Sequence, residues 1–133
     1  MNKIIAKVTN IKNIDSLNIV EFDSKGQKLT MMSLELFGNI KPLSKVILTC
    51  KASSIGVAKN LSGELSYSNR LDCTLESVQT GELLCTLSLK ISEDTTLESI
   101  ITKASVDRMN LRLGDKLEAL IKASDLSIYK IVE

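Results

Sequence analysis

The sequence predicts a mainly β protein that consists of two tandem five-stranded barrels of the OB type, each with a short helix. Two observations lead to this prediction. Short runs of alternating apolar and polar residues, separated by turn residues, follow one another along the chain, and the whole pattern occurs twice. Alternation with a period of two is typical of strands that bury one face. Recurrence of the pattern indicates a duplicated structural unit.

The second half of the chain shows the pattern more clearly. Apolar residues alternate with polar ones over 71–75, and the alternation resumes after Thr80 and Gly81, which predicts a β-hairpin. Gly114 follows a short helical pattern and can adopt the positive φ that a turn requires. The expected elements are strands over 71–75, 83–91, 95–102, 117–122 and 126–132, with a helix within 103–111. Five strands with one helix between the third and the fourth are typical of a small, partly open OB barrel.

The first half repeats this pattern in a degenerate form. Ile4 stands where the second half has Leu71, and Lys-Ala-Ser ends the predicted fourth strand of both halves, at 51–53 and 122–124. The stretch 60–65 between the halves is short and turn-rich, as expected for a linker.

We therefore divide the chain into a first, degenerate domain over residues 1–60 and a second domain over 61–133. Units of about 60 residues bury only about 60% of their unfolded surface. We expect the two units, or several chains, to share a core.

Composition argues against binding to nucleic acid. Lys and Arg together number 17 against 16 Asp and Glu, so there is no basic excess that would hold phosphates. Aromatic residues make up only 3% of the chain, too few for stacking platforms under single-stranded bases.

No apolar stretch has the length of a signal sequence or a membrane span. We therefore expect a cytoplasmic protein without a membrane partner.

The residues that usually carry catalysis are also missing. The chain has no histidine, and its three cysteines are widely spaced within apolar alternation, which indicates small core residues. No phosphate-binding loop, dinucleotide fingerprint or nucleophile elbow is present. We expect no enzyme activity and no site for a metal cation.

The duplicated Lys-Ala-Ser segment suggests a site for an oxyanion. Lysine offers a charged donor, serine offers a hydroxyl, and backbone amides at a strand end can turn toward one concavity. A fully deprotonated oxyanion only accepts hydrogen bonds, so a set of donors alone suits it. The alternative, a tight turn with a solvated lysine, stays open. The candidate donors are Lys122, Ala123 and Ser124, with Lys51, Ala52 and Ser53 as their counterparts in the first half.

A second group of donors precedes the first strand of the second half. Ser66, Ser68, Asn69 and Arg70 follow one another there, and the alternative interpretation is a loop that leads into the strand. Thr102 stands at the start of the predicted helix, where capping of the helix is the favoured role.

These segments together resemble the molybdate-binding Mop or TOBE domain. The resemblance is carried by "SYSNRLDCTLESVQTGELLCTLSL" and "LESIITKASVDRMNLRLGDKLEALIKAS" and covers nearly all of 65–131. The whole chain is similar to the duplicated, stand-alone molbindins, although its first half keeps only the strand pattern and Lys-Ala-Ser.

The resemblance implies a non-catalytic protein that binds molybdate or tungstate for storage or homeostasis. It also implies a homo-oligomer, a trimer in our expectation, with oxyanions at contacts between units. The donors would be the strand-start residues of one unit and the Lys-Ala-Ser segment of a neighbour. The alternative is a molybdate-sensing module that acts through a protein partner, such as a regulator or a transporter ATPase.

One departure from the family concerns Ser68, because relatives often have arginine at this position. We hypothesise that Arg70 compensates, since residues two apart on a strand point to the same face. The alternative is a solvated charge that discourages pairing of strand edges.

Overall fold

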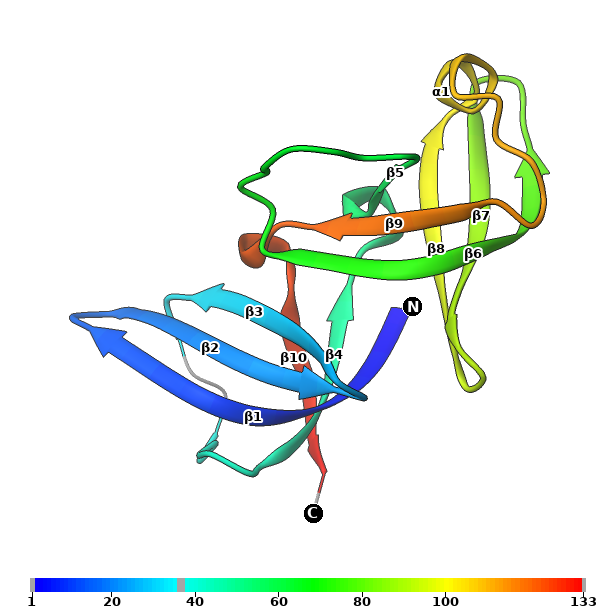
Figure 1. Cartoon of the computed structure of the whole chain (residues 1–133). Coiled ribbons are helices and arrows are strands. Elements are labelled where there is room, and N and C mark those ends of the chain that lie inside the picture. Colours follow the sequence, from blue (N-terminus) through cyan, green and yellow to red (C-terminus); the bar gives the residue numbers. More distant parts are fainter. Residues whose placement is uncertain (1, 36–37, 133) are drawn as a thin grey trace.

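The computed structural model describes residues 2–35 and 38–132, which form two five-stranded antiparallel sheets. We call the sheet with strand order β10-β4-β1-β2-β3 unit one, and the sheet with order β5-β9-β6-β7-β8 unit two. Figure 1 shows unit one below unit two. The strands of unit one are β1 (Asn2–Ile14), β2 (Leu17–Ser24), β3 (Gln27–Ser33), β4 (Lys45–Cys50) and β10 (Ser127–Val132). Those of unit two are β5 (Gly56–Ala58), β6 (Asn69–Thr80), β7 (Leu84–Ser92), β8 (Thr95–Thr102) and β9 (Lys116–Ile121).

The two halves of the chain exchange their fifth strands. β10 follows β9 in the sequence but pairs antiparallel with β4, with Ile128 opposite Leu48. β5 follows β4 in the sequence but pairs antiparallel with β9, with Val57 opposite Ala119. In Figure 1 the red strand β10 runs beside β4 in unit one. Each unit is therefore completed by a strand from the other half of the sequence.

This exchange bears on the division of the chain at residue 60. The boundary describes the repeat in the sequence, whereas both sheets contain residues from either side of it. As a statement about independent domains, the division remains a prediction.

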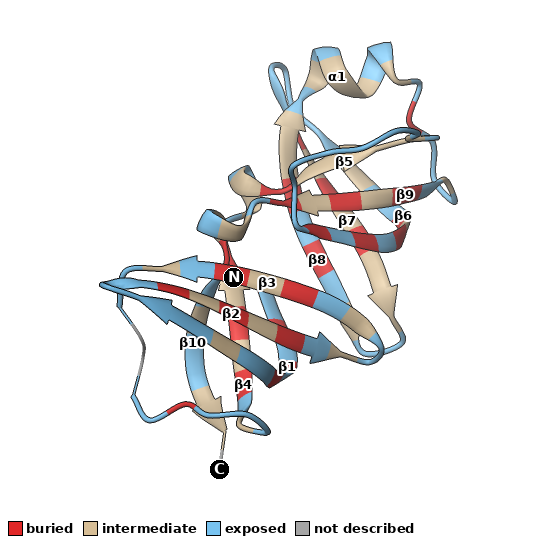
Figure 2. Cartoon of the chain, turned by 60° about the vertical axis from the view of Figure 1, so that its left-hand side comes forward, coloured by how far each residue is buried: buried red, intermediate tan, exposed pale blue. Residues whose placement is uncertain are grey.

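The core follows the alternation seen in the sequence. Along β6 the burial pattern alternates from Asn69 through Leu75, and β1 alternates in the same way from Asn2 through Val8 (Figure 2). The inward side chains of both sheets are aliphatic for the most part, with Phe22 fully buried in unit one. The three cysteines are free and buried, as predicted for small core residues.

The predicted strands and turns of the second half are confirmed. β6 and β7 form the hairpin, α1 (Lys103–Arg108) lies between β8 and β9, and Gly114 has a φ of 90°. In the first half, the corresponding segment between β3 and β4 has no α-helix in its described part, residues 34–35 and 38–44. The two copies thus share their sheets but differ at the helix.

No helix in the described parts of the chain is long and apolar enough to cross a membrane.

Candidate oxyanion site

Both Lys-Ala-Ser segments form the same short turn at the end of a fourth strand. Lys122 has extended backbone angles and precedes the 3-10 turn η2 (Ala123–Asp125), which the N–H of Asp125 closes on the Lys122 carbonyl at 2.9 Å. Lys51 precedes the equivalent turn η1 (Ala52–Ser54) with similar angles and the same kind of hydrogen bond. The duplicated tripeptide therefore encodes a duplicated turn.

Two N–H groups of this turn have no hydrogen-bond acceptor, although the turn also contains the acidic residue Asp125. The N–H groups of Ala123 and Ser124 lie before the first hydrogen-bonded amide of the turn and have no acceptor among the described residues. The side chains of Lys122 and Ser124 are exposed next to them. The turn can therefore offer two amides, a hydroxyl and an ammonium group to one anion.

The register of the sheet brings the second donor group to this turn. Asn69, the first residue of β6, lies opposite Ile121, the last residue of β9. Ser68 and Lys122, the next residues outward from the two strands, therefore lie at the same end of unit two, and Ser66 and Ser68 are exposed there. In the first half, Asn2 lies opposite Cys50 in the same way, which places the start of β1 next to Lys51.

Asn69 has a different set of partners from its exposed neighbours. Its side chain is fully buried, its Oδ1 accepts the Thr30 N–H at 2.7 Å, and its Nδ2 donates to the Thr30 carbonyl at 3.0 Å. Asn2 makes the same pair of bonds with the backbone of Glu98, at 2.8 and 2.9 Å. Each asparagine thus binds the backbone of an edge strand, β3 or β8, in the opposite unit.

Arg70 is engaged with a carboxylate. Its Nε and one terminal nitrogen each donate to an oxygen of Glu118, both at 2.9 Å. The bidentate hydrogen bond with Arg70 lowers the pKa of Glu118 below its ordinary value. The guanidinium of Arg70 is therefore paired with Glu118, and the hypothesis that Arg70 replaces an arginine at position 68 stays a prediction.

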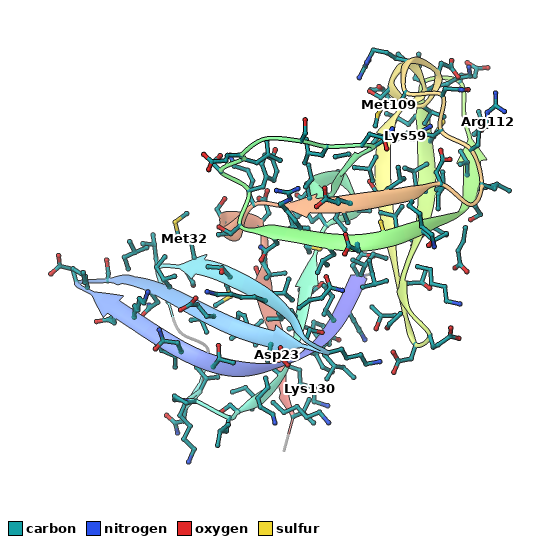
Figure 3. All side chains as sticks on the ribbon, in the orientation of Figure 1. Asp23, Met32, Lys59, Met109, Arg112 and Lys130 are labelled. Carbon is teal, nitrogen blue, oxygen red and sulfur yellow. The ribbon has the colours of Figure 1, made fainter. Side chains whose placement is uncertain are left out.

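The turns lie between the two units. η2 packs against β3 of unit one and η1 against β8 of unit two. Beside η2, Ser124 and Ser127 line a hollow of about 530 Å³ together with Met32 and Ser33 of β3, and Figure 3 labels Met32 there. The sequence did not identify these β3 residues as neighbours of the turn. The only signal was the asparagine at the start of the first strand of each copy.

Thr102 has the role that the sequence favoured. Its side chain accepts a hydrogen bond from the Ser105 N–H at 3.1 Å and caps helix α1.

Over residues 2–35 and 38–132, no group of three or more His, Cys, Asp or Glu side chains is arranged to hold a metal ion.

The second half of the chain matches a known domain family. Residues 65–128 match the TOBE domain family. This chain contains a TOBE domain. The match spans the strand-start residues, β6 to β9 and the second Lys-Ala-Ser turn, so the TOBE domain of this chain holds every candidate donor of its second half.

One solved structure extends the likeness to the first half. A crystal form, with molybdate bound, of the cytoplasmic molybdate-binding protein ModG is 26% identical, with a TM-score of 0.87, and the match covers 96% of this chain and 94% of that one. A molybdate-binding protein from Sporomusa ovata is 29% identical over 51% of this chain and 100% of its own, with a TM-score of 0.49. No curated protein sequence matches the chain. The chain thus has the fold of that molybdate-binding protein over nearly its whole length.

Proposed function

We propose that this protein is a cytoplasmic, non-catalytic binding protein for molybdate or tungstate, with a role in storage or homeostasis. The observation that carries the proposal is the Lys122 turn, where donors without acceptors lie beside the exposed serines that precede β6. The likeness to ModG supports molybdate as the kind of anion, because that protein was crystallised with molybdate bound.

In the proposed site, the anion oxygens accept from the amides of Ala123 and Ser124 and from the side chains of Lys122 and Ser124. Ser66 and Ser68 donate from the strand-start segment that lies beside the turn in unit two. Asn69 holds that segment in place through Thr30, and the Arg70 pair with Glu118 borders the site. The turn of Lys51, Ala52 and Ser53 forms the counterpart in the first half.

Assembly into a homo-oligomer, a trimer in our proposal, would bring strand-start segments and turns of different chains together. Light scattering at micromolar concentration tests this part. A monomer in the presence of saturating molybdate would exclude sites shared between chains, whereas a site within one chain would remain.

Calorimetric titration with molybdate, tungstate and sulfate tests the function. We expect molybdate and tungstate to bind more tightly than sulfate, although all three carry two negative charges, because the spacing of the donors selects for size. Binding to the folded state alone also raises the melting temperature with ligand concentration. Equal affinity for sulfate, or no thermal shift at millimolar molybdate, would contradict the proposal.

A further inference from the structure

The outward face of β1 and β4 in unit one carries side chains that differ from those at the matched positions of unit two. In unit one this face presents Lys3, Ile5 and Lys7 from β1, opposite Thr49, Ile47 and Lys45 from β4. Ile5 is 57% exposed, although it lies in the middle of the sheet. The face is therefore apolar at its centre and basic around it.

On the same face of unit two, the arginine is paired with a carboxylate of the same unit. Where unit one has Lys3 and Ile47, unit two has Arg70 and Glu118, which form the bidentate pair. Lys116, the counterpart of Lys45, donates to the Thr74 hydroxyl at 2.9 Å.

The first copy lacks these partners. Ile5 and Ile47 stand at the positions of Asp72 and Glu118, and Lys7 stands at the position of Thr74. Lys7 and Lys45 form no ion pair with the described residues. Lys3 lies instead over the Tyr129 ring of β10, with its ammonium nitrogen 4.7 Å from the ring centroid. The duplication thus supplies an internal comparison in which Arg70 and Glu118 pair on one face, whereas Lys7 and Lys45 have no ionic partner among the described residues on the other.

The basic face forms one wall of a hollow. The hollow measures about 690 Å³ and is also lined by Asp23 and Ser24 at the end of β2, Lys25 in the turn after it, and Asp94 at the β7–β8 turn. Asp23 lies directly opposite Lys7 on the neighbouring strand. Lys25 and Asp94 form an ion pair that joins the two turns across the units. Figure 3 labels Asp23 in this part of the molecule.

The size and chemistry of this hollow suit an organic anion. Pockets for small molecules typically measure about 300 to 1,000 Å³ and combine apolar walls with a few placed polar groups. Ile5 and Ile47 supply the apolar wall, and Lys3, Lys7 and Lys45 supply cations around it. A bare tetrahedral oxyanion would leave most of such a space empty.

We infer that this hollow binds an amphiphilic organic anion, a molecule with a flat apolar body and a phosphate, sulfonate or carboxylate group. Its body lies against Ile5 and Ile47, and its charged group meets Lys7 and Lys45. This site is distinct from the Lys-Ala-Ser turns, so it does not depend on the proposed function.

Fluorescence titration of the full chain with 8-anilinonaphthalene-1-sulfonate tests the inference, because this dye joins an aromatic body to a sulfonate. We expect one saturable site that molybdate, at the concentration that saturates its own binding, does not compete for. The neutral analogue N-phenyl-1-naphthylamine and inorganic sulfate should each bind at least about tenfold more weakly, since each lacks one half of the interaction.

Two substitutions introduce residues that the other copy already has, so the fold should tolerate them. Ile47→Glu introduces the carboxylate found at position 118, and Lys7→Thr introduces the hydroxyl found at position 74. Lys7→Thr removes one charged contact and Ile47→Glu places a carboxylate against the anion, so each should weaken dye binding by about tenfold or more. Ile14→Glu, at a site 76% exposed in the last position of β1, makes the same change of charge elsewhere and should leave binding unchanged.

Three results would overturn the inference. Unchanged dye binding in both Ile47→Glu and Lys7→Thr would place the dye elsewhere. Equal binding of the neutral analogue would reduce the site to a general apolar surface. Release of the dye as chains associate, with Ile47→Glu giving monomers, would make this face a contact between copies of the chain.

Discussion

Asn69 and Thr30 form a two-bond contact between the units, in which the buried amide side chain pairs with the backbone of an edge strand. The bonds measure 2.7 and 3.0 Å, and the two residues come from different halves of the chain. β3 is the edge of its sheet, so the outer N–H and C=O of Thr30 would otherwise lack a strand partner. Asn2 does the same for Glu98 at the other edge, β8. The contact thus covers an edge and joins the units at once.

We expect Asn69→Ala to lower the free energy of unfolding substantially. The substitution leaves two backbone groups of Thr30 without partners, and each buried group left unsatisfied costs about 1–3 kcal/mol. Chemical unfolding measures the loss. Asn10→Ala is the control, because Asn10 donates to Glu21 at an exposed position and its removal should cost no more than about 0.5 kcal/mol. Equal effects of the two variants would contradict the role of Asn69.

Lys122→Ala and Ser124→Ala should each weaken molybdate binding without unfolding the protein. Losing one hydrogen bond to a charged group costs roughly 1.5 to 3 kcal/mol, about ten- to a hundredfold in affinity. Both side chains are exposed, so the melting temperature of the ligand-free protein should stay constant. Calorimetry on these variants and on Lys51→Ala and Ser53→Ala shows whether the first copy binds as well. Unchanged affinity in both second-copy variants would favour a solvated turn.

Arg70→Ala should change molybdate affinity by less than about threefold, under about 0.7 kcal/mol, because the guanidinium is already paired with Glu118. Glu118→Gln releases the arginine and should tighten binding if Arg70 can reach the anion. The same titrations measure both variants. A tenfold loss in Arg70→Ala would show instead that the guanidinium donates to the anion directly.

Lys59 and Asp115 should make stability depend on pH. The Arg112 N–H, and after it the Lys59 ammonium, lower the pKa of Asp115. A lowered carboxyl pKa adds stability above the unfolded value of about 3.9, and this contribution is lost as the pH falls through the folded value. Asp115→Asn should therefore flatten the fall in melting temperature between about pH 5 and pH 2.

The two copies provide a matched control for Lys59. Its Nζ donates to the Asn110 carbonyl at 3.1 Å and lies 3.1 Å from Asp115, and Figure 3 labels it close to Met109. Lys130 is its counterpart on β10 and forms no ion pair with the described residues. Lys59→Met should lower the melting temperature and Lys130→Met should not. Equal shifts would mean that the Lys59 contacts add no stability.

Cys50 and Cys73 should react slowly with iodoacetamide in the folded protein. Burial raises the pKa of each thiol to about 11, so little thiolate forms at pH 8 and the reagent has poor access. Mass spectrometry before and after addition of denaturant measures the labelling. Rapid labelling of the native protein would show that these core positions open easily.

Local pattern was sufficient to predict the elements, because a strand, a hairpin turn and a helix cap depend on residues close in sequence. The β6–β7 hairpin, the Thr102 cap and the Gly114 turn are examples. The pairing of β10 could not be predicted in this way. Alternation over 126–132 indicates a strand with one buried face but does not say which sheet the strand joins.

The same limit applies to the site. Repetition of Lys-Ala-Ser predicted a duplicated strand end, and the structure shows two equivalent turns there. The sequence could not predict that the side chains of Asn69 and Arg70 already have hydrogen-bond partners, since Thr30 and Glu118 lie far from them in sequence. Long-range partners decide which donors remain available for a ligand.

The exchanged fifth strands give this single chain the covalent form of a swapped dimer. Separated at residues 60–65, each half would keep a strand, β5 or β10, that has no sheet of its own to join, and a sheet that lacks its last strand. The connecting segment turns what would be an encounter between two molecules into a unimolecular step at a high effective concentration. β5 is already present when the strands of unit two are synthesised, whereas unit one cannot complete its sheet until β10 follows.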